Sequence, residues 1–266
     1  MKSNIQFSII VVCLNPGEKL KETLESILSQ TYTDFEVIIK DGGSKDGSLE
    51  QLPKDERIRL YCEPDKSIYE AMNQAVQHAN ADYVLFMNCG DLFHHDTVLS
   101  EAAVHMQKTA DKLHVFYGDT YSTKNDTLIA SPREIDGFTC YRNIPCHQSC
   151  FYALELCKNK PYETSLRIRA DYDHFLWCYY VAKASMNYLG ITVSSYEGGG
   201  YSESKENQKR DKEEHRQIVE TYMSKSELFR YRAIMALTLA PLRSAMAESP
   251  VFSKLYHGVK QLIYRG

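Results

Sequence analysis

The sequence predicts an α/β protein built on a doubly wound, mostly parallel central sheet that is flanked by helices. In the first half of the chain, short apolar runs alternate with amphipathic helical patterns, as in strand–helix–strand units with right-handed crossovers. Two of the apolar runs stop abruptly at polar turns that contain Asp41 and Asp91. Parallel strands of open sheets deliver ligand-binding residues at this edge. Asp41 and Asp91 are therefore the first candidates for a functional site.

The predicted elements of the first half follow from local patterns. The helices show apolar residues at every third or fourth position, and the strands are short runs rich in valine, isoleucine and aromatic residues. Strands are predicted at residues 7–13, 35–40, 58–62 and 83–87. Helices are predicted at residues 18–29 and 67–80, with a poor helix at 49–52 that Pro53 interrupts.

After Asp91 the pattern becomes less regular. Helices are predicted at residues 97–108 and 171–181, and strands at residues 115–121 and 188–195. Residues 126–144 follow no clear period and are interpreted as irregular. Charges of both signs are dense at residues 203–216, which favours a solvated helix face.

The composition is that of a globular protein without a nucleic-acid-binding surface. The 266 residues are 43% hydrophobic and 25% charged, and the net charge of −4 provides no basic face for nucleic acid. No run reaches the ~18 uninterrupted apolar residues of a membrane span. The apolar run at residues 5–14 is not followed by a signal-peptide cleavage site. The eight cysteines include no Cys-x-x-Cys pair and are expected to be reduced, so we predict a cytoplasmic protein.

The C-terminal residues differ in composition from the rest. We divide the chain into a domain at residues 1–226 and a basic, amphipathic helical extension at residues 227–266. From residue 228 onward, six basic residues stand against one acid, Glu248, among many apolar side chains. Such a segment can lie on an anionic membrane surface. Packing on the first domain, or on a second copy of the chain in a homodimer, is an equal alternative.

Several motifs occur together along the chain. They are residues 10–15, 24–36, 63–73, Asp41-Gly-Gly-Ser-Lys-Asp-Gly47, Asn88-Cys-Gly-Asp91, His147-Gln148 and Ala170-Asp-Tyr-Asp173. In this order they resemble the family 2 glycosyltransferases of GT-A fold, of the non-processive type that builds bacterial surface glycans. The resemblance covers residues 5–200. It implies transfer of one sugar from a nucleotide-diphosphate sugar to the hydroxyl of a glycan or lipid-linked acceptor.

The resemblance also implies a nucleotide-binding set. Asp41 would contact the nucleobase, and because a carboxylate accepts the imide N–H of uracil or thymine, a UDP-sugar is favoured. A glycine loop lets the backbone approach the nucleoside closely. An ordinary Asp-Gly turn, and a helix cap at Asp65, are the competing interpretations. The implied nucleotide-binding residues are Asn15, Asp41, Gly43, Asp65, Lys66, Asn73 and Asn88.

Asn88-Cys-Gly-Asp91 stands where the family has its Asp-x-Asp motif, which holds Mn²⁺ or Mg²⁺ on the donor diphosphate. A hard divalent cation takes oxygen ligands and neutralises charge on the leaving group. Asn88 and Gly90 replace the acids, so Asp91 is the one carboxylate that remains. His147 is assigned as the second metal ligand, with a contact to the donor phosphate or a structural histidine as the alternatives.

Asp171 is assigned as the general base. A sugar hydroxyl becomes a good nucleophile when a carboxylate in hydrogen-bond reach removes its proton, and direct displacement inverts the anomeric carbon. The family usually has Glu-Asp where this chain has Ala170-Asp171, and Asp173 is the competing base. The glycines at residues 198–200 are interpreted as the hinge of a lid that closes over the donor.

Other functions compete with this interpretation. A sugar-nucleotide pyrophosphorylase should carry a glycine-rich, basic loop after the first strand, where this chain has Leu-Asn-Pro-Gly-Glu-Lys. A catalytically weak nucleotide-sugar-binding protein is the second alternative, because Asn88 and Ala170 replace acids. Processive synthases carry a Gln-x-x-Arg-Trp motif, but the single tryptophan, Trp177, follows Leu176.

Overall fold

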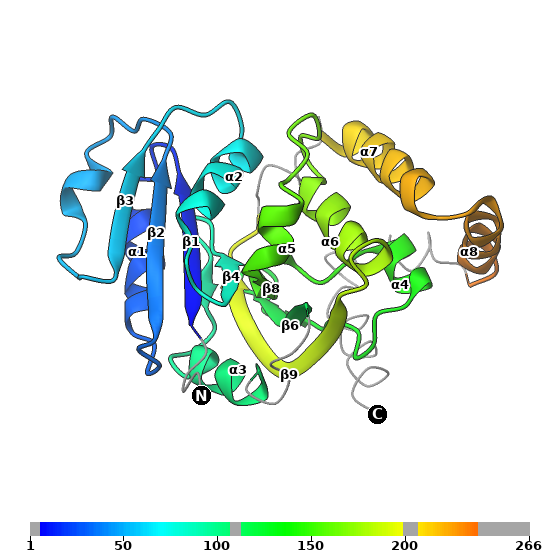
Figure 1. Cartoon of the computed structure of the whole chain (residues 1–266), viewed down its shortest axis with the longest axis horizontal. Coiled ribbons are helices and arrows are strands. Elements are labelled where there is room, and N and C mark those ends of the chain that lie inside the picture. Colours follow the sequence, from blue (N-terminus) through cyan, green and yellow to red (C-terminus); the bar gives the residue numbers. More distant parts are fainter. Residues whose placement is uncertain (1–5, 107–112, 199–206, 239–266) are drawn as a thin grey trace.

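The computed structural model describes residues 6–106, 113–198 and 207–238. Its centre is a mixed sheet in the order β3-β2-β1-β4-β8-β6-β9-β5, with β7 paired to β6 (Figure 1). The strands are β1 (Phe7–Cys13), β2 (Phe35–Asp41), β3 (Ile58–Cys62), β4 (Tyr83–Phe86), β5 (Leu92–Phe93), β6 (His114–Ser122), β7 (Thr127–Ile129), β8 (Cys150–Ala153) and β9 (Ser185–Tyr196).

Helices flank both faces of this sheet. The α-helices are α1 (Glu18–Leu28), α2 (Ile68–His78), α3 (Val98–Met106), α4 (Gly137–Arg142), α5 (Leu154–Asn159), α6 (Ala170–Tyr180), α7 (Asn207–Tyr222) and α8 (Lys225–Leu237). Two 3₁₀ turns, η1 (Ser48–Gln51) and η2 (His147–Ser149), complete the described elements. Among the residues described, no helix is long and apolar enough to cross a bilayer.

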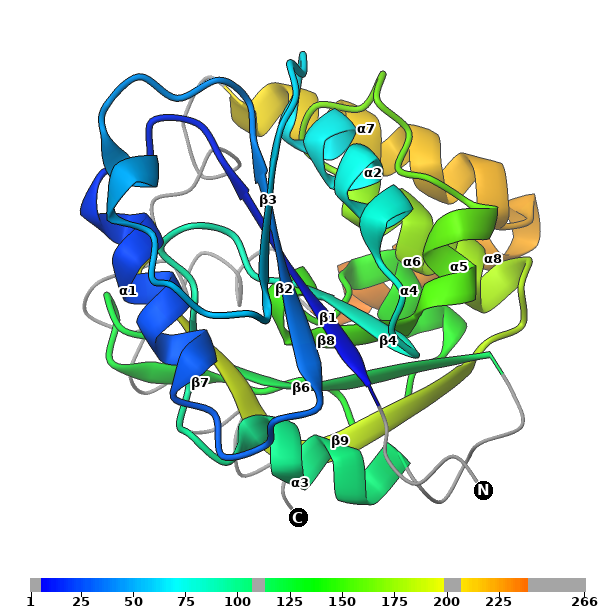
Figure 2. The same ribbon diagram turned by 60° about the vertical axis from the view of Figure 1, so that its left-hand side comes forward.

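The alternation of apolar residues in β1 explains why the sheet has two cores. Phe7, Ile9 and Val11 point to the face that α1 and α3 cover, whereas Ile10 and Val12 point to the opposite face. That opposite face is covered by α2, α5 and α6, as Figure 2 shows. A strand that is buried on both faces reads as a continuous apolar run, which is the pattern seen in the sequence.

The first four strands of the sheet run parallel, so their carboxyl ends meet at one edge. The register pairs Cys13 with Asp41, and Asp41 with Cys62. β1 also pairs with β4 up to Ile10 and Phe86, and the amide of Met87 donates to the Ile10 carbonyl at 2.8 Å. The polar turns that follow β1, β2 and β4 therefore begin side by side.

The first half of the chain agrees closely with the sequence prediction, because each of its predicted strands and helices is present. α2 begins where Ser67 caps it by accepting the Glu70 amide at 3.2 Å. The second half differs more. β8 lies between β4 and β6 and is antiparallel to both. β9 has twelve residues and is curved, and its pairing with β6 is irregular near Asp119 (Figure 1). Such short or bulged strands depend on their neighbours and leave little periodic signal.

Three sequence expectations concern segments of the second half. Residues 126–144 are not irregular throughout, since they contain β7 and α4. Residues 207–216 of the charged stretch belong to α7, which is not a purely solvated face, because Glu214 is only 7% exposed. The proposed lid hinge at 199–200 and the extension beyond residue 238 lie outside the described residues.

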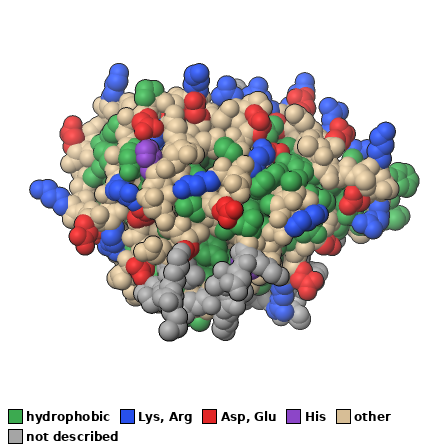
Figure 3. Space-filling model, viewed as in Figure 1, with side chains coloured by type: hydrophobic (Ala, Val, Ile, Leu, Met, Phe, Trp, Pro, Cys, Tyr) green, Lys and Arg blue, Asp and Glu red, His purple; other side chains and the backbone are tan. Residues whose placement is uncertain are grey.

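α8 begins at Lys225, just before the predicted boundary at residues 226–227, and contains most of the described residues of the predicted C-terminal extension. Its Leu228 and Tyr231 are buried in the core that α6 and α7 also build. Its opposite side exposes Phe229 (77%) and Leu237 (84%). Figure 3 shows apolar side chains at the right-hand edge of the molecule, where α8 lies in Figure 1.

Candidate active site

A cavity of about 520 Å³ is lined by the beginning of α2, the turn after β4, η2 and the beginning of α6. Four predicted site residues line it: Asn88, Asp91, His147 and Asp171. The structure thus brings the two predicted metal ligands and the predicted base together. The cavity also carries charges that the sequence prediction did not include, on Lys19, Arg167, Arg169, Glu197 and Asp211.

The turn at Asn88–Asp91 is fixed by α1. The Asp91 amide donates to the Asn88 carbonyl at 2.9 Å, which closes the turn. Gly90 has φ of 98°, a left-handed conformation that favours glycine. Thr23 of α1 accepts the Gly90 amide at 2.9 Å and donates to the Asp91 carbonyl at 3.1 Å. The side chains of Asn88 and Asp91 are therefore presented from a rigid backbone.

His147 connects this turn to Asp171. Its Nε2 lies 3.0 Å from the Asn88 amide nitrogen, and its Nδ1 lies 3.6 Å from Asp171 Oδ2. Because an amide nitrogen can only donate, this hydrogen bond assigns the lone pair to Nε2 and the hydrogen to Nδ1. The Asn88 Oδ1 atom is buried and has no hydrogen-bond partner among the described residues. An oxygen in this state is available to a cation or a ligand N–H.

The surroundings of Asp91 raise the pKa of its side chain. Burial raises the pKa of the Asp91 carboxyl to about 6, although the nearby His147, the Asn88 backbone and Lys19 act in the opposite direction. A carboxylate that has lost water in this way gains from a bound cation, since the cation restores favourable interactions with the charged form.

The two candidate bases occupy different environments. Asp173 is 8% exposed, and its carboxylate accepts hydrogen bonds from Lys160 and Tyr222, both at 3.0 Å. Asp171 lines the cavity, with His147 on one side and Tyr69 on the other. Asp173 therefore ties α6 to its neighbours, whereas Asp171 can meet a ligand.

α7 holds the segment that leads into Asp171. The Glu214 carboxylate accepts the backbone amides of residues 167, 168 and 169 at 2.9, 3.0 and 3.0 Å. Asp211 pairs with the Arg169 guanidinium through two bonds, of 2.7 and 2.9 Å. These amides belong to the segment directly before α6, and Arg169 is the N-cap of that helix, so Glu214 lies near a helix N-terminus, where an anion is favourable. No local pattern predicts this contact, because both acids belong to a stretch of the sequence that resembles a solvated helix face.

Asp41 lies at the end of β2 and is buried, but it does not line the cavity. Its Oδ2 accepts the amides of Gly43 and Ser44 at 2.7 and 2.8 Å, and its Oδ1 accepts the Ser44 hydroxyl and the Cys13 thiol. Burial opposes ionisation of Asp41, but the hydrogen bonds from Ser44 and Gly43 outweigh it and lower its pKa. The carboxylate is thus ionised and occupied within its own turn.

Lys40 is a residue that the sequence prediction missed. Its ammonium group is buried and donates to the Asp41 carbonyl (3.2 Å), the Glu63 carbonyl (2.6 Å) and Asp65 Oδ2 (3.0 Å). Gly42 allows this approach, because a Cβ there would lie 2.7 Å from Asp65 Oδ2. A lysine that interrupts an apolar strand directly before Asp41 was the available signal, since buried lysines are nearly always paired.

The remaining predicted nucleotide ligands also lie outside the cavity lining. Asn15 follows β1 and accepts the Lys45 amide at 2.8 Å, which joins the turns after β1 and β2. Lys66 is exposed at the start of α2. Asn73 exchanges two hydrogen bonds with the backbone of Tyr162, at 2.9 and 2.8 Å. Asn73 therefore connects α2 to the segment before α6.

Solved structures share this architecture. The mannosyltransferase PcManGT from Pyrobaculum calidifontis, in complex with GDP-Man and Mn²⁺, matches with a TM-score of 0.64 and 16% identity over 99% of this chain and 82% of that chain. S. aureus TarS 1-349 in complex with UDP-GlcNAc matches with a TM-score of 0.60 and 17% identity. That match covers 74% of this chain and 59% of the TarS fragment. The fold is GT-A, as the sequence predicted.

Sequence comparison identifies the family. The model of Glycosyl transferase family 2 matches residues 8–154. The PGL/p-HBAD biosynthesis glycosyltransferase of Mycobacterium bovis (strain BCG / Pasteur 1173P2) is 34% identical over 204 residues, which is 74% of this chain and 78% of the relative. The uncharacterized glycosyltransferase Rv1514c of Mycobacterium tuberculosis is 29% identical over 66% of this chain and 70% of its own. The chain belongs to glycosyl transferase family 2, which confirms the family that its motifs indicated.

Proposed function

We propose that this glycosyltransferase moves a single sugar from a nucleotide-diphosphate sugar to an acceptor hydroxyl, with inversion at the anomeric carbon. The observation that carries the proposal is the shared cavity of Asn88, Asp91, His147 and Asp171. Residues from three distant parts of the chain bring oxygen and nitrogen donors next to a carboxylate, because His147 contacts both Asn88 and Asp171. Asp41 and its turn stand at the adjoining strand ends.

Asp171 acts as the general base in this proposal. The acceptor hydroxyl gives its proton to the Asp171 carboxylate while its oxygen forms a bond to the anomeric carbon of the donor. The bond from that carbon to the diphosphate oxygen breaks at the same time, so the nucleoside diphosphate leaves from the opposite face. One displacement of this kind inverts the configuration.

We propose that the cavity binds a hard divalent cation, Mn²⁺ or Mg²⁺, through Asp91, Asn88 and His147. Asp91 offers a carboxylate, and Asn88 Oδ1 is a buried oxygen without a partner among the described residues. The lone pair of His147 Nε2 accepts a hydrogen bond from the Asn88 amide and would have to exchange that hydrogen for the cation. Oxygen and imidazole donors suit these ions. A bound cation would supply charge neutralisation for the donor diphosphate. Only one of the three groups is anionic, so we expect weaker metal binding than an Asp-x-Asp pair gives.

The nucleotide is proposed to lie along the strand ends, held by Asn15, Asp41, Gly43, Asp65, Lys66, Asn73 and Asn88. We favour uridine, because Asp41 is ionised and an imide N–H can replace its weakest donor, the Cys13 thiol. One structural relative, TarS, binds UDP-GlcNAc and another, PcManGT, binds GDP-Man, so guanosine is the competing nucleoside. Titration calorimetry with UDP and GDP in the presence of Mn²⁺ separates them.

The acceptor is proposed to be a glycan or a lipid-linked glycan. The mycobacterial relative is named for PGL/p-HBAD biosynthesis. We propose that the enzyme is cytoplasmic, where its eight free thiols would stay reduced. We also propose that α8 contacts an anionic membrane through the exposed Phe229 and Leu237, beside Arg230 and Arg232. A homodimer through the same helix is the alternative. The division of the chain near residue 226 remains a prediction.

Flotation with anionic vesicles distinguishes the two roles of α8. Full-length protein should float with the vesicles, and Phe229→Glu should float less. If both remain at the bottom of the gradient and Phe229→Glu changes the molar mass by light scattering, α8 is a dimer contact.

The transferase activity is tested with a panel of UDP- and GDP-sugars and simple hydroxyl acceptors. We expect one donor to release its nucleoside diphosphate faster with acceptor than without, in a reaction that EDTA suppresses and Mn²⁺ restores. The anomeric configuration of the product, read from its NMR coupling constant, should be opposite to that of the donor. Donor binding without release under any condition would instead support a binding protein.

A further inference from the structure

Tyr69 lies within hydrogen-bond distance of the proposed base, closer to it than His147 does. It stands in the first turn of α2, is 7% exposed and lines the cavity. Its hydroxyl lies 3.2 Å from Asp171 Oδ1 and 2.6 Å from the Ile168 carbonyl. Tyr69 thus contacts both the base and the backbone that leads into it, from an element about a hundred residues earlier in the chain (the separation is 102).

The two carboxylate oxygens of Asp171 face different partners. Oδ1 lies toward Tyr69, and Oδ2 lies toward His147 Nδ1 at 3.6 Å. When one oxygen of a carboxylate is hydrogen-bonded to a buried hydroxyl, rotation about the Cβ–Cγ bond is restricted. The other oxygen then keeps a fixed direction. Reaction rates depend steeply on the position of a catalytic group, since a misplacement of ~1 Å can lower the rate ~100-fold.

The second acceptor lets the Tyr69 hydroxyl serve Asp171 in both of its states. A phenol has one hydrogen, which it can share between Oδ1 and the Ile168 carbonyl. When Oδ2 of Asp171 holds the proton taken from the acceptor, Oδ1 is a carbonyl oxygen that can still accept the phenol hydrogen, which the phenol shares with the Ile168 carbonyl. No buried polar group is left without a partner at either stage, which avoids the penalty of an unmade hydrogen bond.

We propose that Tyr69 is a positioning residue for Asp171: its hydroxyl holds Oδ1, so that Oδ2 is presented to the acceptor hydroxyl beside His147. This inference rests on the proposed transfer reaction. It assigns a chemical role to the hydroxyl of Tyr69 that the ring alone would not fulfil.

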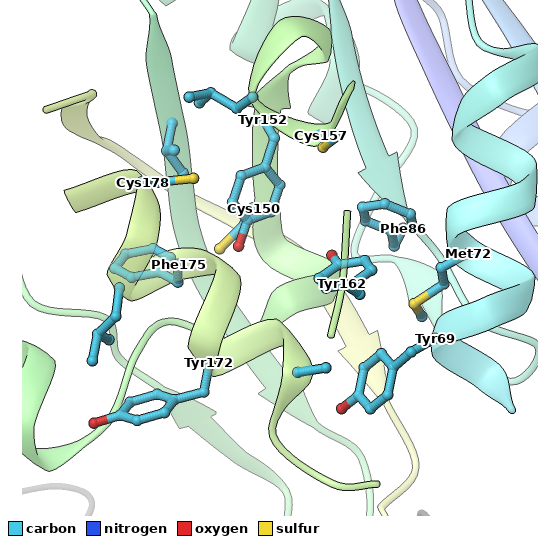
Figure 4. Close-up of a cluster of buried hydrophobic side chains, with 14 of the residues drawn as sticks. Tyr69, Met72, Phe86, Cys150, Tyr152, Cys157, Tyr162, Tyr172, Phe175 and Cys178 are labelled. Atoms are coloured by element: carbon cyan, nitrogen blue, oxygen red, sulfur yellow. The ribbon is translucent and has the colours of Figure 1, made fainter. Parts of the chain in front are cut away.

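Tyr162 offers a matched control in the same apolar cluster. Its ring lies 5.5 Å from that of Tyr69, and it is equally buried. Its hydroxyl has no hydrogen-bond partner among the described residues. In Figure 4 the hydroxyl of Tyr69 points away from the cluster, whereas that of Tyr162 points into it. Tyr→Phe at either position removes one oxygen from the same core.

The experiment compares Tyr69→Phe, Tyr162→Phe and Asp171→Asn in the full-length enzyme. We expect Tyr69→Phe to lower kcat about 10-fold with an unchanged Kd for the donor, and Tyr162→Phe to keep the wild-type kcat. When Tyr69→Phe is combined with Asp171→Asn, kcat should fall no further than in Asp171→Asn alone. The effects of two residues that act together are not additive. Thermal melting shows whether each variant is folded.

The possible failures are distinguishable. If Asp171→Asn transfers sugar at the wild-type rate, the proposed base is wrong. If Asp171→Asn is impaired but Tyr69→Phe is not, or if Tyr162→Phe loses as much activity, only the role of Tyr69 is wrong. An additive loss in the double variant would show that Tyr69 acts on something other than Asp171.

Discussion

Asp41 and Asp171 are both acids of the proposed site, yet they are held in opposite ways. Two of the three residues that bond to the Asp41 side chain stand two and three positions away, and the third is Cys13 on the paired strand. Asp171 is flanked by Tyr69 of α2 and His147 of η2. One acid is fixed by its own turn, and the other by the assembled fold.

This difference separates two tasks. A turn that satisfies its own carboxylate can form early and keep its shape without the rest of the site, as Asp-Gly turns do. Asp171 needs α2, η2 and α7 in place before its carboxylate is aimed. We expect the Asp41 turn to be robust to single changes, and the Asp171 side of the cavity to be sensitive to changes far away in the sequence.

The largest expected effect is that of Asp171→Asn. Loss of the base should lower kcat by about 10²- to 10⁴-fold with an unchanged Kd for the donor. Initial-rate kinetics and calorimetry measure the two quantities. Asp173→Asn is the control, because Asp173 bonds to Lys160 and Tyr222 rather than facing the cavity. Folded Asp173→Asn should keep its kcat, and a loss as large as that of Asp171→Asn would reverse the assignment.

Acid should lower the stability of α6, which carries Asp171, and of the Asp41 turn over different pH ranges. His174 of α6 is buried, and burial lowers its pKa from 6.5 to about 4, so the unfolded chain binds a proton first as the pH falls. The contribution of His174 to the free energy of unfolding should therefore decrease by about 3 kcal/mol between pH 6.5 and 4. Asp91, whose pKa is raised from 3.8 to about 6, contributes in the opposite direction over the same range. The pKa of Asp41 is lowered from 3.8, so its contribution is lost only below that pH.

Urea unfolding at a series of pH values measures this dependence. His174→Phe keeps a ring in the same aromatic surroundings, and between pH 6.5 and 4 its free energy of unfolding should decrease less than that of the wild type. An unchanged slope in this variant would mean that other groups cause the acid sensitivity.

Glu214→Gln tests the support that α7 gives to the start of α6. An amide has one acceptor oxygen where the carboxylate has two, so at least one of the three backbone N–H groups loses its partner. The free energy of unfolding should fall by about 2 kcal/mol. The neighbouring Glu213 is solvent-exposed in a 3.8 Å pair with Lys209, so Glu213→Gln should change it by less than about 0.5 kcal/mol. Equal effects would contradict a specific role for Glu214.

The smallest effect is expected for Ser44→Ala. Asp41 keeps its bonds to the amides of Gly43 and residue 44, so the turn should survive with a loss of about 1 kcal/mol in the free energy of unfolding. A loss comparable with that of Glu214→Gln would show that the turn is less independent than its local bonds indicate.

The first half of the fold and four cavity residues could be predicted from the sequence. Apolar runs with abrupt polar ends located the strand edges, and the motif order located Asn88, Asp91, His147 and Asp171. Asn73 shows the limit of such reasoning. Its motif position implied a nucleotide contact, which stays a prediction, whereas its two hydrogen bonds to the backbone of Tyr162 follow from no local pattern.

The sequence by itself determined where strands end and which acids follow them, because period and turn chemistry are properties of neighbouring residues. Only the tertiary structure decided that β8 enters the sheet antiparallel, that Glu214 holds the start of α6, and that Asp171 rather than Asp173 faces the cavity. These contacts join residues far apart along the chain. Their geometry depends on how helices pack across the sheet, which no single segment encodes.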